Sequence, residues 1–128
     1  KENPVYLYES ITSILEQTIL PSDFVLVCDG PLKNELDNVI NEFEGRYPIL
    51  FQIVRLDQNK GLGNALNIGL RYCKYNLVAR MDSDDIALPD RCERELSEFQ
   101  KNKALDIVSG TILELSILKN REKEYNKL

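Results

Sequence analysis

The sequence predicts an α/β fold in which a mostly parallel sheet is flanked by helices. Short continuous apolar runs bounded by turn residues, the pattern of strands buried on both faces, alternate with segments of helical apolar spacing. The helical segments are about 10–15 residues long, which suits right-handed crossovers between parallel strands. With 128 residues, the chain has the size of one domain or of part of a larger one.

The individual elements follow from local signals. Asn3 followed by Pro4 predicts an N-cap and the first turn of a helix, whose apolar stripe ends near Gln17. Residues 24–27 are a continuous apolar run and predict a buried strand, and residues 32–45 have the spacing of an amphipathic helix. The remaining predicted elements are a strand over 49–56, a helix over 62–73, a strand over 76–81, a helix that begins at Pro89 and extends to Phe99, and a strand within 105–115.

Two further expectations concern the ends of the chain. A parallel sheet of this kind normally begins with a strand, whereas this chain begins with a helix, so we expect a first strand upstream of Lys1. Residues 119–128 are mostly charged and polar, and they predict a solvated helix or a frayed end.

Composition excludes several kinds of chemistry. The absence of histidine excludes Ser–His and Cys–His nucleophiles and histidine-ligated zinc within these residues. The net charge of −5 makes nucleic acid a poor candidate partner, and no uncharged apolar run approaches the ~18 residues that span a membrane. The three cysteines are far apart and fit reduced thiols in a cytoplasmic protein. Carboxylates, amides and backbone groups are left to perform any chemistry.

Acidic residues follow two of the predicted strands. Asp29 follows the first, and Asp82, Asp84 and Asp85 follow the third. Ligands of open parallel sheets bind outside the carboxyl ends of the strands, so we expect both features at one edge. Two unit charges 4 Å apart cost about 4 kcal/mol at a surface-like dielectric, so the three carboxylates either splay into solvent or hold a cation. Oxygen ligands alone favour Mg²⁺ or Mn²⁺.

Three common ligand-binding motifs do not fit. An EF-hand loop that starts at Asp82 would place Ile86 and Ala87 where it needs an oxygen ligand and a glycine. The glycines of residues 61–69 do not form the dinucleotide-binding pattern, and the chain contains no P-loop. Gly61 and Gly63 either allow the backbone to approach a ligand or form a helix-entry turn.

Four segments, in this order, resemble family 2 glycosyltransferases. They are S-I-L-E-Q-T at 13–18, V-C-D-G at 27–30, N-K-G-L-G-N-A-L-N at 59–67, and M-D-S-D-D at 81–85 with Pro89 and Arg91 downstream. The resemblance extends to about Gly110. It implies a GT-A fold, whose Rossmann-like half binds the nucleotide and whose other half binds the acceptor. Residues 1–128 then look like a single partial domain, the nucleotide-sugar-binding half, with 111–128 either frayed or the start of the connection to the acceptor half.

The resemblance also implies roles for individual residues. Asp29 matches the aspartate that binds the donor's base, usually uracil, and Asp82 matches the one that contacts the ribose. Asp84 matches the ligand of the divalent ion, Mg²⁺ or Mn²⁺, that bridges the two donor phosphates. Asn59 and Gly61 match the loop before the nucleotide-facing helix. The family's general base lies well downstream, so the catalytic residue is expected beyond residue 128.

The implied function is metal-dependent transfer of a sugar, with inversion, from a nucleotide-sugar such as a UDP-sugar to a saccharide or lipid-linked acceptor. Such enzymes serve polysaccharide biosynthesis in the cytoplasm or at the inner face of the membrane, and these residues alone are expected to be inactive. The sequence departs from the family at Cys28, where many members have a second acidic residue, and at Leu66, where many have arginine. A non-catalytic regulatory or interaction domain and a nucleotidyltransferase are the alternatives.

Overall fold

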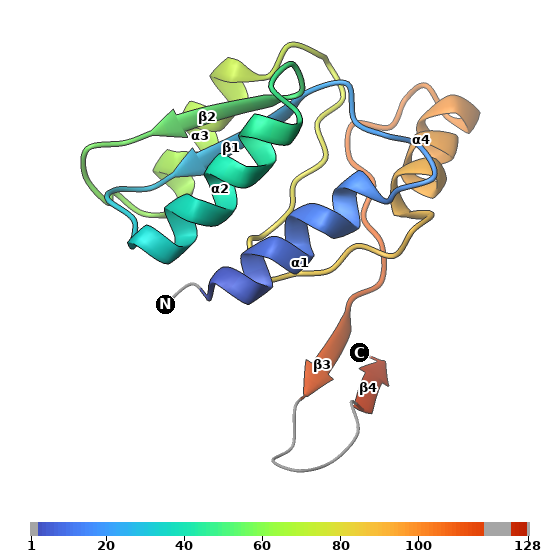
Figure 1. The fold of residues 1–128 in the computed structure, drawn as a ribbon. Coiled ribbons are helices and arrows are strands. Elements are labelled where there is room, and N and C mark those ends of the chain that lie inside the picture. Colours follow the sequence, from blue (N-terminus) through green and yellow to red (C-terminus); the bar gives the residue numbers. More distant parts are fainter. Residues whose placement is uncertain (1–2, 117–123, 128) are drawn as a thin grey trace. The chain divides into compact units, whose positions relative to one another are not determined.

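The structure is a computed structural model that describes residues 3–116 and 124–127. The chain divides into two compact units, Lys1–Cys92 and Glu93–Leu128. The first unit contains α1 (Pro4–Leu15), β1 (Phe24–Cys28), α2 (Asn34–Arg46), β2 (Phe51–Arg55) and α3 (Leu62–Tyr72) (Figure 1). Every one of these elements was predicted, with bounds that differ by a few residues.

The sheet of the first unit is a parallel pair among the residues that the structure describes. β1 pairs with β2 from Phe24↔Phe51 to Cys28↔Arg55, so both strands end at the same edge. The crossover between them is α2, because parallel strands need a long connection. The predicted α/β class is therefore confirmed.

Helices cover both faces of this sheet (Figure 1). Cys28 belongs to the hydrophobic core that α1 and α2 form with the sheet, and the most buried members of that core are Ile40 and Phe43. Its neighbour Val27 points the opposite way, as successive strand residues do. A Cβ on Gly69 of α3 would lie 2.9 Å from the Val27 methyl group, so α3 packs closely against that second face.

Local capping explains where α1 begins. The Asn3 side chain accepts a hydrogen bond of 2.9 Å from the backbone N–H of Val5, and Pro4 occupies the first helical turn. The Asn–Pro prediction is thus confirmed at this helix start.

The remaining elements are α4 (Arg91–Lys101), β3 (Leu113–Ser116) and β4 (Glu124–Lys127). β3 and β4 form an antiparallel pair. No helix within the described ranges is long and apolar enough to cross a membrane.

One prediction about the later elements was wrong, since residues 76–81 form no strand. The strand predicted within 105–115 is present but begins only at Leu113, and its pairing is antiparallel. Glu124–Lys127 is a strand where a solvated helix or a frayed end was predicted, and the rest of 119–128 lies outside the described residues. Apolar pattern expresses only a preference, because a strand also needs a neighbouring backbone to complete its hydrogen bonds. Leu77 and Ile107 accordingly remain exposed, at 53% and 82%.

Candidate functional site

Asp29 connects the loops that follow the two strands. It comes directly after β1, and its carboxylate accepts hydrogen bonds from the backbone N–H groups of Lys60 (2.9 Å) and Gly61 (3.0 Å). These two residues lie immediately before α3. The carboxylate thus satisfies N–H groups at a helix N-terminus, where a negative charge is favourable.

Two glycines allow this close approach. Gly30 has a φ of +98°, and a Cβ at this position would lie 2.7 Å from the backbone nitrogen of Asn59. Gly61 has a φ of +89°, and its N–H also contacts the Asn59 side-chain oxygen at 3.2 Å. The structure therefore brings together three predicted nucleotide-binding residues: Asp29, Asn59 and Gly61.

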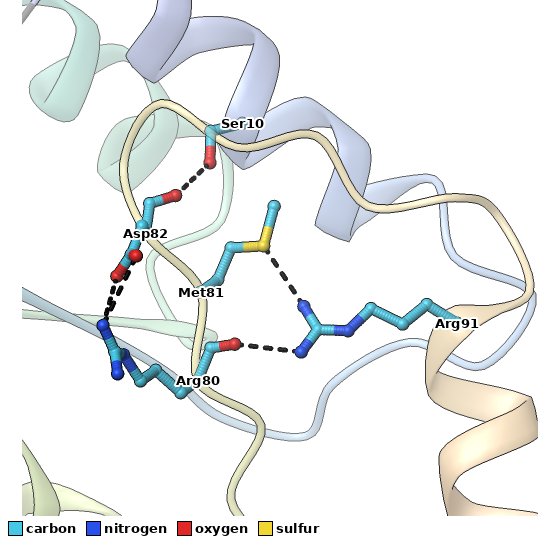
Figure 2. A network of polar contacts seen from close by, with 5 residues as sticks. All are labelled: Ser10, Arg80, Met81, Asp82 and Arg91. Atoms are coloured by element: carbon cyan, nitrogen blue, oxygen red, sulfur yellow. Dashed lines mark hydrogen bonds and ion pairs between the residues drawn. The ribbon is translucent and has the colours of Figure 1, made fainter. Parts of the chain in front are cut away.

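Asp82 lies in a different setting from the one predicted, because no strand precedes it. Its backbone carbonyl accepts a hydrogen bond of 3.1 Å from the Ser10 hydroxyl of α1. Its carboxylate oxygens lie 3.0 and 3.3 Å from the same guanidinium nitrogen of Arg80 (Figure 2). A carboxylate has about four lone-pair positions, so this pairing leaves Asp82 able to accept from a ligand hydroxyl.

Arg91, the first residue of α4, follows the segment that contains the acidic residues and contacts the start of that segment. Figure 2 shows its guanidinium donating to the backbone carbonyl of Arg80, at 3.0 Å, and to the sulfur of Met81, at 3.2 Å. Arg80 therefore lies beside Asp82, and Arg91 contacts the two residues that precede Asp82. They oppose the repulsion between the carboxylates without removing it.

Residues 82–85, which we call the acidic turn, show the effect of that repulsion. Burial raises the pKa of Asp85, and the negative charges of Asp82 and Asp84 raise it further, whereas Arg91 and Arg80 act in the opposite direction. The turn is closed by a 3.3 Å hydrogen bond from the Asp85 N–H to the Asp82 carbonyl. Asp84 lies between them with an exposed side chain. A cation would relieve this excess of negative charge.

The donor set fits a hard divalent ion only in part. In the portion of the chain that the structure describes, no three histidine, cysteine, aspartate or glutamate side chains converge as a ready metal site. Mg²⁺ is usually held by one or two carboxylates and by substrate phosphates, so a preformed cage is not required. Asp84, exposed on an oxygen-rich turn, fits the role of such a single ligand.

The acidic turn is attached to the helix that leads into β1. α1 contributes Leu7 to the same hydrophobic core as Cys28, the last residue of β1. Ser10, which holds Asp82, lies about one turn further along α1 than Leu7. This connection favours a position near the edge where Asp29 lies, and a single site that contains both acidic features stays a prediction.

Sequence reasoning missed the polar residues of α1 and of the turn after it that contact this segment. Ser10, Ser13 and Gln17 are buried although they are polar. Their spacing of three and four residues places them on one side of a helix, which was the available signal.

Comparison with known proteins identifies the family. The family model described as glycosyl transferase family 2 matches residues 1–125. The chain belongs to glycosyl transferase family 2. The resemblance based on the four sequence segments is therefore confirmed.

Relatives support the same assignment. The chain is 43% identical to an uncharacterized glycosyltransferase of Haemophilus influenzae, over 89% of this chain and 42% of the relative. It is 39% identical to the amylovoran biosynthesis glycosyltransferase AmsE of Erwinia amylovora, over 89% of this chain and 42% of the relative. It is 38% identical to a UDP-Gal:alpha-D-GlcNAc-diphosphoundecaprenol beta-1,3-galactosyltransferase of Escherichia coli, over 89% of this chain and 41% of the relative. The chain thus spans about two fifths of the length of these relatives.

Proposed function

We propose that residues 1–128 are the nucleotide-sugar-binding part of a metal-dependent, inverting glycosyltransferase. The observation that carries this proposal is the acidic turn at 82–85, anchored to α1 and still rich in negative charge. Family membership favours this function over a regulatory domain or a nucleotidyltransferase. Residues 111–128 would then begin the connection to an acceptor-binding part.

The loops around Asp29 would bind the nucleotide. Asp29 would accept a hydrogen bond from the base, and its two existing bonds to N–H groups hold the carboxylate in place for that contact. Asn59 and Gly61 would border the nucleotide at the start of α3, whose N-terminus favours negatively charged groups. Asp82 would accept from a ribose hydroxyl. A UDP-sugar donor is supported by the relative whose name specifies UDP-Gal.

Asp84 would be the protein ligand of the divalent ion, Mg²⁺ or Mn²⁺. Bound against the two donor phosphates, such an ion stabilises the negative charge that a diphosphate leaving group gains. Because Asp84 is exposed and shares its turn with two other carboxylates, it can approach a diphosphate only if that charge is balanced. Ion and donor are therefore expected to bind together.

The transfer itself needs a base from another part of the protein. The acceptor hydroxyl attacks the anomeric carbon, the bond from that carbon to the phosphate oxygen breaks, and the hydroxyl proton passes to a general base. We expect this base beyond residue 128, and residues 1–128 alone to bind nucleotide without transferring sugar. Relatives named for amylovoran biosynthesis and for a diphosphoundecaprenol substrate support a saccharide or lipid-linked acceptor. A location in the cytoplasm or at the inner face of the membrane stays a prediction from the resemblance.

Calorimetric titration with UDP tests this proposal. With Mn²⁺ present we expect binding to the full-length protein, and with a chelator in its place the affinity should fall. Asp84→Ala should weaken Mn²⁺-dependent binding by about tenfold or more, the size of losing one charge-assisted contact. Asp106→Ala, which removes an exposed carboxylate far along the chain, should change nothing. Unchanged affinity in Asp84→Ala would contradict the metal assignment.

A further inference from the structure

One side of α1, and the turn that directly follows it, carry polar residues that the structure buries. Ser10, Ser13 and Gln17 are 4%, 8% and 5% exposed, and together we call them the α1 polar stripe. Buried polar groups cost free energy unless they form hydrogen bonds, so their partners indicate why the helix carries them. Those partners lie in residues 82–92, more than seventy positions further along the chain.

Gln17 binds this segment at both of its amide atoms. Its Nε2 donates to the backbone carbonyl of Leu88 at 2.7 Å, and its Oε1 accepts from the backbone N–H of Cys92 at 3.0 Å. The same Nε2 also lies 3.0 Å from the Ser13 carbonyl within α1, which fixes the side-chain orientation. The backbone adds one contact, from the Thr18 N–H to the Pro89 carbonyl at 2.8 Å.

The two serines bind the part of the segment that carries the acidic turn. The Ser13 hydroxyl donates to the Ser10 carbonyl at 2.7 Å and accepts from the N–H of Ala87, a buried residue, at 3.0 Å. The Ser10 hydroxyl donates to the Asp82 carbonyl at 3.1 Å. The acidic turn is therefore held on both of its sides.

Residues 82–90 form neither helix nor strand, so regular backbone pairing does not determine their course. Side-chain bonds from the two serines give the Ala87 N–H an acceptor and give the Asp82 carbonyl a second donor beside the Asp85 N–H. The direction of each acidic side chain depends on that course. A shift of about 1 Å in a binding group can cost up to a hundredfold in function.

We propose that the α1 polar stripe positions the acidic turn for donor binding, with Ser10, Ser13 and Gln17 as positioning residues that do not touch the donor. This inference rests on the proposed function, since it assigns the turn to the donor site. The contrasting explanation is that these bonds only stabilise the fold. In that case any variant of equal stability would bind nucleotide equally well.

The test compares Ser13→Ala with Ile11→Val in the full-length protein. Ile11 lies on α1 but belongs to the hydrophobic core, at 3% exposed, so its variant lowers stability without touching the acidic turn. Ser10→Ala is a second variant that removes one bond to Asp82 and keeps a good helix former, in case Ser13→Ala does not fold. UDP affinity in Mn²⁺ and amide hydrogen exchange at Ala87 are measured for each protein.

We expect Ser13→Ala to bind UDP roughly tenfold more weakly, with faster exchange at Ala87, and Ile11→Val to bind as the wild type does. Equal UDP affinity in the folded serine variants would overturn the inference, whatever the exchange at Ala87, and so would an equal loss in Ile11→Val. If the wild type itself fails to bind UDP, the proposed function is wrong and the inference falls with it. The wild-type titration therefore separates the two failures.

Discussion

Replacing Gly30 with alanine would test how the two loops of the site fit together. Gly30 has a φ of +98°, in the left-handed region that residues with a Cβ adopt at a cost. The added Cβ would lie 2.7 Å from the Asn59 nitrogen, 3.2 Å from the Gln58 carbonyl carbon and 3.3 Å from the Asn59 Cα. All three are backbone atoms, so a side-chain rotation cannot relieve the contact.

The magnitude follows from three contributions. The left-handed conformation costs about 1–2 kcal/mol, and displacement of the packed 58–59 backbone costs about 1–3 kcal/mol more. Alanine also restricts the unfolded chain, which offsets about 0.4–1 kcal/mol. We expect the free energy of unfolding to fall by about 1–5 kcal/mol, with a central value of about 3 kcal/mol. At roughly 4 °C per kcal/mol for a domain of this size, the melting temperature should fall by roughly 12 °C at that central value.

Urea and thermal unfolding followed by circular dichroism measure this change. Gly45→Ala is the matched control, because Gly45 lies in α2 and a Cβ there meets nothing within 4 Å. Alanine is the better helix former, so this variant should be up to about 1 kcal/mol more stable than the wild type. If Gly30→Ala unfolds at the wild-type midpoint, the close contact between the two loops is refuted.

Two further predictions concern charge and packing. Because burial and two neighbouring carboxylates raise the pKa of Asp85 above its ordinary 3.8, the folded state binds this proton more readily than the unfolded state. Asp85→Asn should therefore raise the free energy of unfolding at pH 7. This gain in stability should shrink as the pH falls through the raised pKa and vanish below pH 3.8. If urea unfolding shows that the gain persists below pH 3.8, the raised pKa of Asp85 is contradicted. Phe43→Ala should lower the free energy of unfolding by about 3–5 kcal/mol, since this ring is 2% exposed, whereas Ile49→Ala, at 93% exposed, should lie within about 0.5 kcal/mol of the wild type. Equal urea midpoints for the last two variants would refute the location of the core.

Helices were predicted well because their signals are local. The Asn3–Pro4 cap and the apolar spacing of α1, α2 and α3 each depend on residues within a few positions of one another. The first two strands were also found, since both lie in a pair that the described chain completes. Residues 76–81 have a comparable apolar pattern and form no strand, because pairing depends on a second backbone that the pattern does not specify.

The candidate site, too, has features that the local sequence indicates and contacts that only the structure shows. Glycine and aspartate at the end of β1 indicated a ligand-binding loop, and the structure adds that Asp29 already holds the N–H groups before α3. The pairing of Asp82 with Arg80 spans two residues, but position 80 lies outside the four segments that carry the resemblance. The contacts of Ser10 and Ser13 span 72 and 74 residues and left no local trace beyond two serines on one side of a helix.

The sequence by itself determined the order of the helices, the first two strands, the family motifs and the residue types available for chemistry. These depend on side-chain periodicity, on turn-forming residues and on which functional groups are present. Only the tertiary structure decided which apolar segments pair as strands, which loop Asp29 secures and what holds the acidic turn. The physical reason is that backbone hydrogen-bonding groups must be satisfied wherever they are buried, and their partners can come from any part of the chain that folding brings near.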